Sequence, residues 1–164
     1  MRRTVTPADT PSLLALAEAT GIFLPGEVEG LLGGVLNALH AGQLGDGHTA
    51  WAWADGPGGP PAGWVYFSPV DNTNGVWNLW WIGVDPPRQG RGLGGEMLDA
   101  VEVQVRAAGG RLLLVETSAT PAFDPVRRFY ASRRCAEGGR IPDFYADGDG
   151  KVTYYKRVAT RDAA

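Results

Sequence analysis

Apolar residues at helical spacing dominate the first quarter of the chain. An Ala-rich apolar stretch from Pro11 to Ala19 predicts a first helix, which we expect to end at Gly21. A second helix is predicted from Pro25 to near Gly42, because its apolar residues recur three or four positions apart. These residues are Val28, Leu31, Leu32, Val35, Leu36 and Leu39. We therefore expect two helices to precede the first strand.

The pattern then changes to one that is typical of strands. Residues 48–54 alternate around two tryptophans, and residues 62–68 are rich in aromatic and branched side chains. The Gly- and Pro-rich residues 55–61 between them predict a turn, so the two strands should be antiparallel. A third strand is predicted at 77–84.

Strand and helix alternate in the second half of the chain. Residues 92–108 have the clearest helical pattern, with one apolar stripe formed by Leu93, Met97, Val101 and Val105. Beyond it the sequence predicts a buried strand at 111–117, a short helix at 124–133 capped by Asp124, and a last strand at 152–158. A strand, a helix and another strand in succession favour a parallel pair within a mixed sheet. We expect one domain over residues 1–164, with a polar tail at 158–164.

Composition and charge exclude several classes of protein. Apolar residues make up 44% of the chain and charged residues 20%, which is typical of a globular protein. The formal net charge of −3 gives no support for a nucleic-acid partner, and no apolar run is long enough to span a membrane. Cys135 is the only cysteine, and a lone thiol favours a reducing compartment, so we expect a cytoplasmic protein. No residues have the spacing of metal ligands, and no metal is expected.

A glycine-rich segment carries the most specific chemical pattern. It lies between the third predicted strand and the long helix and reads Gln89-Gly90-Arg91-Gly92-Leu93-Gly94-Gly95. Helix N-termini leave backbone N–H groups unpaired and carry partial positive charge, and glycines allow a phosphate to approach them. The segment therefore predicts a cradle for a pyrophosphate. It is not a P-loop, because no Gly-Lys-Ser/Thr follows, and its glycine spacing differs from the dinucleotide-binding fingerprint.

This segment resembles the acetyl-CoA motif Q/R-x-x-G-x-G/A of the GNAT family of N-acetyltransferases. A second similarity is Val115-Glu116-Thr117-Ser118 followed by Arg128-Phe129-Tyr130. The resemblance implies the GNAT fold, an α/β (α+β) architecture with a mixed, mostly antiparallel sheet of about six to seven strands, flanking helices and a central acetyl-CoA unit. It also implies that acetyl-CoA is the co-substrate, held by residues 89–95 and by the end of the third predicted strand. In that strand end a backbone N–H of Ile82, Gly83 or Val84 would stabilise the oxyanion.

Transfer of an acetyl group to an amine also needs a base and an acid. Glu116 is the candidate base, and burial at the end of its strand is expected to raise its pKa. The alternative is a glutamate that anchors a neighbouring loop. The resemblance implies that Tyr130 points toward the sulfur of coenzyme A, where its hydroxyl can protonate the leaving thiolate. The alternative is that Tyr130 is an aromatic residue of the core. We expect both side chains to converge on the thioester.

The acceptor site is less distinct in the sequence. Most of the six tryptophans are expected in the core, and strand alternation puts Trp80 and Trp81 on opposite faces, so at most one can face the acceptor. His40 and His48 are interpreted as ordinary surface residues. Asp143, Asp147 and Asp149 could hold a cationic amine, but a solvated acidic surface is the preferred interpretation.

The predicted function is transfer of acetyl from acetyl-CoA to a primary amine of a small molecule or an amino acid, in a ternary complex. Two alternatives stay open. The first is a peptide or protein N-terminal acetyltransferase, which an open groove would favour. The second is a non-catalytic acetyl-CoA-binding module, against which the presence of Glu116 and Tyr130 argues. The expected partner is a small-molecule amine, and a homodimer is left open.

Overall fold

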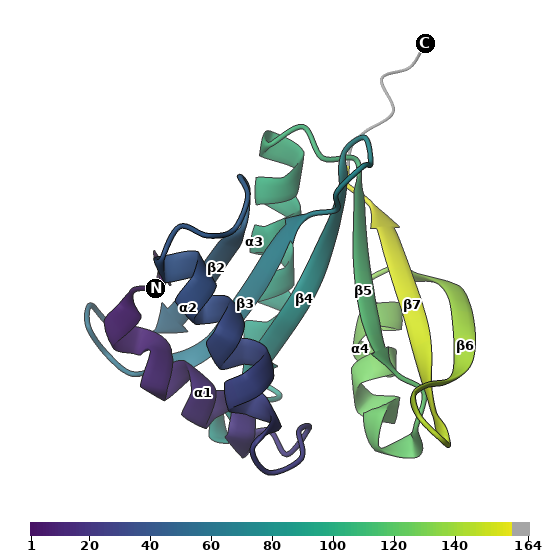
Figure 1. Ribbon diagram of the computed structural model, residues 1–164, viewed down its shortest axis with the longest axis horizontal. Helices are drawn as coiled ribbons and strands as arrows, with labels where there is room; N and C mark the ends of the chain where they lie inside the picture. The colour runs from purple at the N-terminus through teal and green to yellow at the C-terminus, as the bar shows by residue number, and fades with distance from the viewer. Residues whose placement is uncertain (159–164) are drawn as a thin grey trace. The chain divides into compact units, whose positions relative to one another are not determined.

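The computed structural model describes residues 1–158, whose helices and strands are labelled in Figure 1. The four α-helices are α1 (Thr10–Ala19), α2 (Gly34–His40), α3 (Leu93–Ala107) and α4 (Asp124–Ser132). The seven strands are β1 (Arg2–Thr4), β2 (Thr49–Ala54), β3 (Pro61–Pro69), β4 (Val76–Val84), β5 (Leu112–Ser118), β6 (Ala136–Ala146) and β7 (Asp149–Arg157). No helix of this part of the chain is both long enough and apolar enough to cross a membrane.

The strands form one sheet in the order β1-β2-β3-β4-β5-β7-β6. Strand β5 runs parallel to β4 and antiparallel to β7, and β1, β2 and β3 pair antiparallel, so the expected mixed sheet is confirmed. Hairpins join β2 to β3 and β6 to β7, whereas the parallel strands β4 and β5 are joined through α3. The contacts of the chain group into two compact units. Unit 1 holds Met1–Ser68 and Trp81–Ala100, and unit 2 holds Pro69–Trp80 and the chain from Val101 onward.

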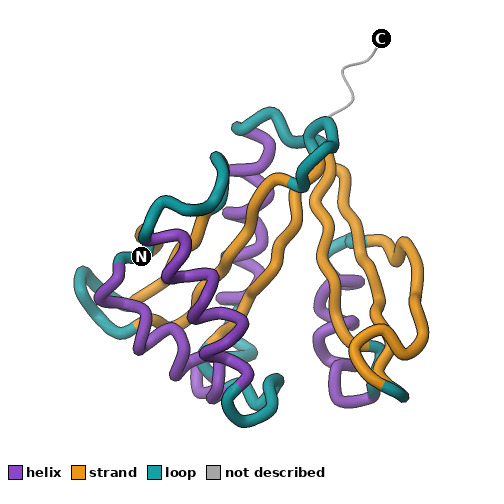
Figure 2. The backbone as a smooth tube through the Cα atoms, viewed as in Figure 1, coloured by secondary structure: helices purple, strands orange, loops and turns teal. Residues whose placement is uncertain are grey.

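In unit 1, helices α1 and α2 cover one face of β2 and β3, where they bury a common apolar cluster (Figure 2). Trp64 is fully buried in this cluster and donates its indole N–H to the carbonyl oxygen of Leu13 in α1, at 3.1 Å. The first turns of α3 pack on Gly63 of β3, where an added Cβ would lie 2.8 Å from the sulfur of Met97. Glycine is therefore needed for this close approach of helix and strand.

In unit 2, strand β5 lies between β4 and β7 and supplies the buried residues Leu113 and Val115. Val152 and Tyr154 of β7 are buried as well. Gly110 ends the connection from α3, and a Cβ there would lie 2.4 Å from Val105. The apolar run that predicted a buried strand is thus part of the core of unit 2.

The structure corrects several of the expected elements. Strand β1 precedes both helices, and the additional strand β6 forms between the short helix and the last strand. Every residue of β6 is exposed, so no alternation of apolar and polar residues indicated it. The second helix begins as a π-helical turn, Glu29–Gly33. Asp124 is not a cap: it is the first residue of α4 and forms an ion pair with Arg127. Of the predicted tail at 158–164, Val158 is buried, and the remainder lies outside the described residues.

Candidate active site

The connection from β4 to α3 is open along its backbone. After β4 ends at Val84, a short 3-10 turn leads to Gly90 and Gly92, whose φ angles are +72° and +88°. Residues with side chains rarely adopt such positive φ angles, which explains glycine at both positions. A Cβ built on either glycine would meet nothing within 4 Å, so the backbone faces free space. The side chain of Gln89 turns back and donates to the carbonyl oxygen of Val84 at 3.1 Å.

The start of α3 offers the chemistry that a pyrophosphate needs. The helix begins at Leu93 directly after Gly92, and Gly94 and Gly95 add no bulk to its first turn. The N–H groups of a first turn have no partner within the helix and carry partial positive charge. Glu96 would oppose an anion, but its carboxylate accepts the indole N–H of Trp53 at 2.9 Å. Residues 89–95 therefore fit the predicted anion cradle.

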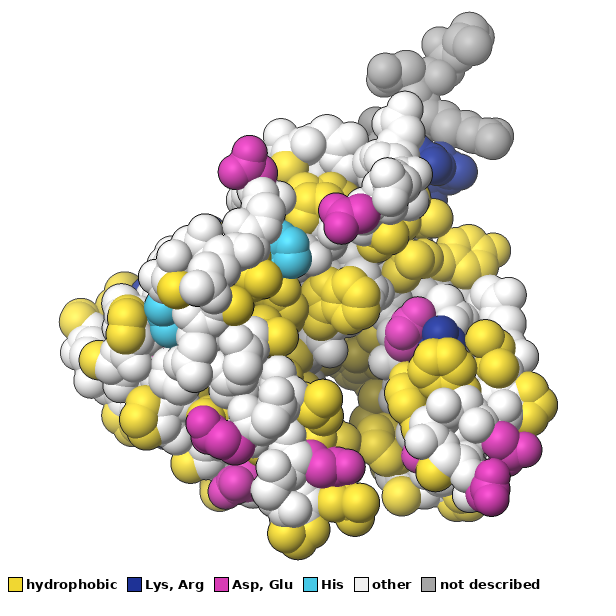
Figure 3. Space-filling view, in the orientation of Figure 1, with side chains coloured by type: hydrophobic (Ala, Val, Ile, Leu, Met, Phe, Trp, Pro, Cys, Tyr) yellow, Lys and Arg dark blue, Asp and Glu magenta, His cyan; other side chains and the backbone are white. Residues whose placement is uncertain are grey.

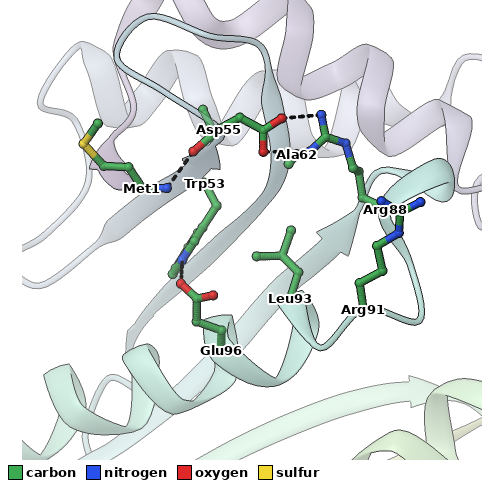
Figure 4. A pocket seen from close by; sticks show the side chains of 9 residues that line it. Met1, Trp53, Asp55, Ala62, Arg88, Arg91, Leu93 and Glu96 are labelled. Carbon is green, nitrogen blue, oxygen red and sulfur yellow. Dashed lines mark hydrogen bonds and ion pairs between the residues drawn. The ribbon is translucent and has the colours of Figure 1, made fainter.

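A cavity of about 350 Å³ adjoins the cradle in unit 1 (Figure 4). Arg88 and Arg91 reach it from the connection between β4 and α3, and Arg88 forms an ion pair of 2.5 Å with Asp55. Sequence reasoning did not single out Trp53, Asp55 and Arg88, because their proximity depends on how β2 lies beside the β4–α3 connection.

The end of β4 holds the three residues that were expected to border the acetyl group. Ile82 and Val84 are half-buried, and Gly83 is buried. A Cβ on Gly83 would lie 2.3 Å from the indole ring of Trp81, so the glycine lets that ring lie along the strand. The N–H of Asp85 donates to Ala62 of β3 at 2.9 Å, which holds this strand end in place.

Glu116 lies in unit 2 and, contrary to the expectation, is not buried. Its side chain is 34% exposed, and one carboxylate oxygen lies 3.4 Å from the ammonium of Lys151. The same ammonium lies 3.9 Å from the ring centre of Phe144. In Figure 3, a basic side chain lies between an acidic side chain and several hydrophobic ones on the surface formed by β5, β6 and β7. The expectation that Glu116 is buried is therefore wrong.

Tyr130 on α4 is buried in the core of unit 2. Its ring packs on that of Tyr154, with the ring centres 5.7 Å apart, and only 3% of the residue is exposed. Burial disfavours the phenolate, and the nearby Cys135 thiol adds to this, so the pKa of Tyr130 lies well above its ordinary value. The hydroxyl therefore keeps its proton. This burial agrees with a core residue and equally with a proton donor.

Glu116 and Tyr130 lie on opposite faces of the β5–β7 pair. Val115 pairs with Tyr154 in register, so these two side chains share the face on which Tyr130 packs. Glu116 is the next residue along β5 and points to the other face, as does its register partner Thr153. Convergence of Glu116 and Tyr130 on one thioester stays a prediction.

The remaining expectations for aromatic and polar residues have mixed outcomes. Trp80 is 53% exposed and Trp81 only 6%, and the other four tryptophans are buried as expected. His48 is no ordinary surface residue, because it is half-buried and its Nδ1 lies 2.6 Å from the hydroxyl of Tyr66. Likewise, the Nε2 of His40 lies 3.2 Å from the hydroxyl of Thr10.

The acidic residues near the last hairpin are partly engaged within unit 2. Asp143 accepts the N–H of Gly148 at 2.7 Å, and Asp149 accepts the hydroxyl of Ser118 at 2.5 Å. Within residues 1–158, no group of three or more His, Cys, Asp or Glu could hold a metal ion.

Comparison with known proteins places this geometry among the acetyltransferases. The sequence model of the acetyltransferase (GNAT) family matches residues 30–135. No curated protein sequence matches the chain. A crystal structure from Desulfovibrio desulfuricans, of a protein assigned to the acetyltransferases of the GNAT family, is similar with a TM-score of 0.87 and 33% identity, over 97% of this chain and 99% of that one.

Two more distant structures share the fold. A ribosomal-protein alanine N-acetyltransferase from Escherichia coli aligns with a TM-score of 0.75 and 16% identity, over 99% of this chain and 96% of that one. An aminoglycoside 6′-N-acetyltransferase in complex with coenzyme A aligns with a TM-score of 0.76 and 15% identity, over 98% of both chains. At these identities the similarity concerns the fold.

Proposed function

Because this chain belongs to the acetyltransferase (GNAT) family, we propose that it transfers an acetyl group from acetyl-CoA to the primary amine of a small molecule or an amino acid. One observation carries the proposal: the backbone is open at Gly90 and Gly92, directly before the fifteen-residue helix α3. The pyrophosphate of acetyl-CoA would lie on residues 89–95, where helix N–H groups and the absence of side chains favour an anion.

Bound acetyl-CoA supplies the reactive thioester. The neutral amine forms a bond to the carbonyl carbon, the carbon–sulfur bond breaks, the amine loses one proton and the thiolate gains one. A backbone N–H of residues 82–84 would stabilise the oxyanion. We assign the proton removal to Glu116, directly or through water, and the proton donation to Tyr130.

Their arrangement in unit 2 supports this division of roles. Glu116 is partly exposed, so it can reach a solvated amine on its face of the sheet. Tyr130 is buried on the other face and keeps its proton, as a donor must. A base and an acid on opposite faces suit a ternary complex in which the two substrates approach from opposite sides.

A panel of amines tests the proposal. Wild-type protein is incubated with acetyl-CoA and single amines from three classes (amino acids and their amides, polyamines and aminoglycosides, and short peptides), and release of the free thiol of CoA is measured. We expect amine-dependent release with the first or second class. Turnover of the peptides alone would instead identify an N-terminal acetyltransferase, and binding of acetyl-CoA with no turnover would identify a non-catalytic module.

The same assay examines the role of Glu116. We expect Glu116→Gln to flatten the rise of kcat/KM with pH, because that rise reports deprotonation of the amine. An unchanged pH profile would leave Glu116 as an anchor for the neighbouring Lys151.

A further inference from the structure

Three buried indole groups of unit 1 differ in their hydrogen bonds. Trp53 donates to Glu96 at 2.9 Å, and Trp64 donates to the carbonyl oxygen of Leu13 at 3.1 Å. Trp81 is equally buried, with 6% of the residue exposed, but its Nε1–H has no hydrogen-bond partner among the described residues. An unpaired buried donor costs free energy and is rare in folded proteins, so it calls for an explanation.

The position of Trp81 suggests what the free N–H is for. Trp81 directly precedes residues 82–84, the part of β4 that we expect to border the acetyl group. The ring cannot easily turn away: it lies along the strand over Gly83, where any Cβ would overlap with it, and it packs on Trp64 with the ring centres 5.6 Å apart. The donor is therefore held at the reacting end of the strand.

One aromatic side chain that packs on Trp81 comes from the connection after α1. Phe23 lies over the indole with the ring centres 5.3 Å apart and is only partly buried. Its neighbours Ile22 and Leu24 are 40% and 69% exposed. The hydrogen bonds of Leu24 are with Glu27, so this connection is held by local bonds that survive a shift of the segment. A π-helical turn follows at Glu29–Gly33, and such turns occur frequently at functional sites.

We propose that Trp81 is a specificity-determining residue, whose indole N–H binds an oxygen atom that the acceptor carries beside its amine. The acceptor would enter as the segment that carries Phe23 shifts. Its apolar part would then pack between the rings of Phe23 and Trp81, and its oxygen would accept the hydrogen bond of the Trp81 N–H. This favours α-amino acids and α-amino amides with an aromatic or apolar side chain over simple alkylamines. The inference rests on the proposed function and narrows its substrate class.

This inference is tested with two amines, of which only one carries a carbonyl oxygen beside its amino group. L-Phenylalaninamide carries a carbonyl oxygen beside its amine, and phenethylamine has the same ring without that group. The measured quantity is the ratio of their kcat/KM values in wild type, in Trp81→Phe and in the control Trp53→Phe, whose indole N–H is already paired with Glu96. We expect the ratio to fall about tenfold in Trp81→Phe and to stay unchanged in Trp53→Phe, because only the first variant loses a hydrogen bond to the acceptor. An equal ratio in all three proteins overturns the inference.

Binding without turnover separates this inference from the proposed function. In the ¹⁵N spectrum of the wild-type protein, the indole N–H signals of the six tryptophans are observed during titration with each probe in the presence of CoA. We expect L-phenylalaninamide to shift the indole proton of Trp81 downfield, as a new hydrogen bond does, and phenethylamine to cause no such downfield shift. This result upholds the inference even if no amine is acetylated, and it needs no folded Trp81 variant. A Trp81 indole proton that L-phenylalaninamide does not shift downfield would overturn the inference even if other amines are turned over.

Discussion

At the scale of single residues, the fold decides how each candidate group can handle a proton. Tyr130 is buried against Tyr154, and burial raises the pKa of its hydroxyl, which favours the protonated form. Glu116 is partly exposed beside Lys151, so an amine from solvent can approach it. Of the two assignments, that of Tyr130 gives the sharper test, because one atom can be removed while the ring stays.

Tyr130→Phe should lower kcat and leave the KM for acetyl-CoA nearly unchanged. The variant keeps the ring that packs on Tyr154 and loses only the proton donor, and a positioned donor contributes about 10²–10⁴-fold in rate. Steady-state kinetics with an accepted amine measure both quantities, and a thermal melt of the variant controls for folding. If kcat were the same as in wild type, protonation of the thiolate would have to come from water.

At the scale of elements, the glycines in the connection from β4 into α3 meet two requirements. Gly90 and Gly92 take φ angles that place the backbone of the turn, and the same absence of side chains keeps the start of α3 accessible. Neither requirement involves long-range packing, so a substitution here can separate backbone strain from loss of binding.

Gly92→Glu should weaken acetyl-CoA binding about tenfold or more, because a carboxylate would stand where the pyrophosphate is expected. Isothermal titration calorimetry measures the Kd. The matched control is Gly42→Glu after α2, since Gly42 also has a positive φ, +65°, and open space around it. We expect both variants to lose some stability and only Gly92→Glu to lose affinity. Equal affinities in the two variants would place the pyrophosphate elsewhere.

At the scale of the whole molecule, the ion pair between Arg3 and Asp9 makes the free energy of unfolding depend on pH. Arg3 of β1 holds both carboxylate oxygens of Asp9 at 2.6 Å, and Asp9 also accepts the N–H of Thr6. These bonds, the one to Arg3 foremost, lower the pKa of Asp9 to about 2. They thereby fasten the edge strand β1 to the start of α1.

Asp9→Asn should therefore lower the free energy of unfolding by about 2 kcal/mol at neutral pH. The folded-state pKa of Asp9 is depressed, so this contribution is fully present above its unfolded pKa of 3.8 and is lost as pH falls toward about 2. Urea unfolding of both proteins at pH 7, 4 and 2.5 should show the difference shrinking with acid. Asp55→Asn removes an exposed ion pair with Arg88 and should change stability far less. A difference that persists at the lowest pH would contradict this account.

Much of the architecture could be predicted from the sequence, because short stretches of the chain specify most of its helices and strands. Helices α1 and α3 and strands β2 to β5 were predicted because each is specified by spacing and turn residues within a short stretch. The anion cradle at residues 89–95 stays a prediction. Strand β6 was missed because its residues are all exposed and carry no periodic pattern, and β1 because a three-residue edge strand exists only through its pairing with β2.

What the tertiary structure alone decided concerns residues whose surroundings come from distant parts of the chain. The exposure of Glu116 and its pairing with Lys151 follow from the register of β5 and β7, and the same register puts Glu116 and Tyr130 on opposite faces. The free indole N–H of Trp81 depends on Gly83, Trp64 and Phe23, which no local pattern connects. Local spacing thus determined which chemistry the chain carries, while burial and register, which are properties of the packed sheet, determined where each group can act.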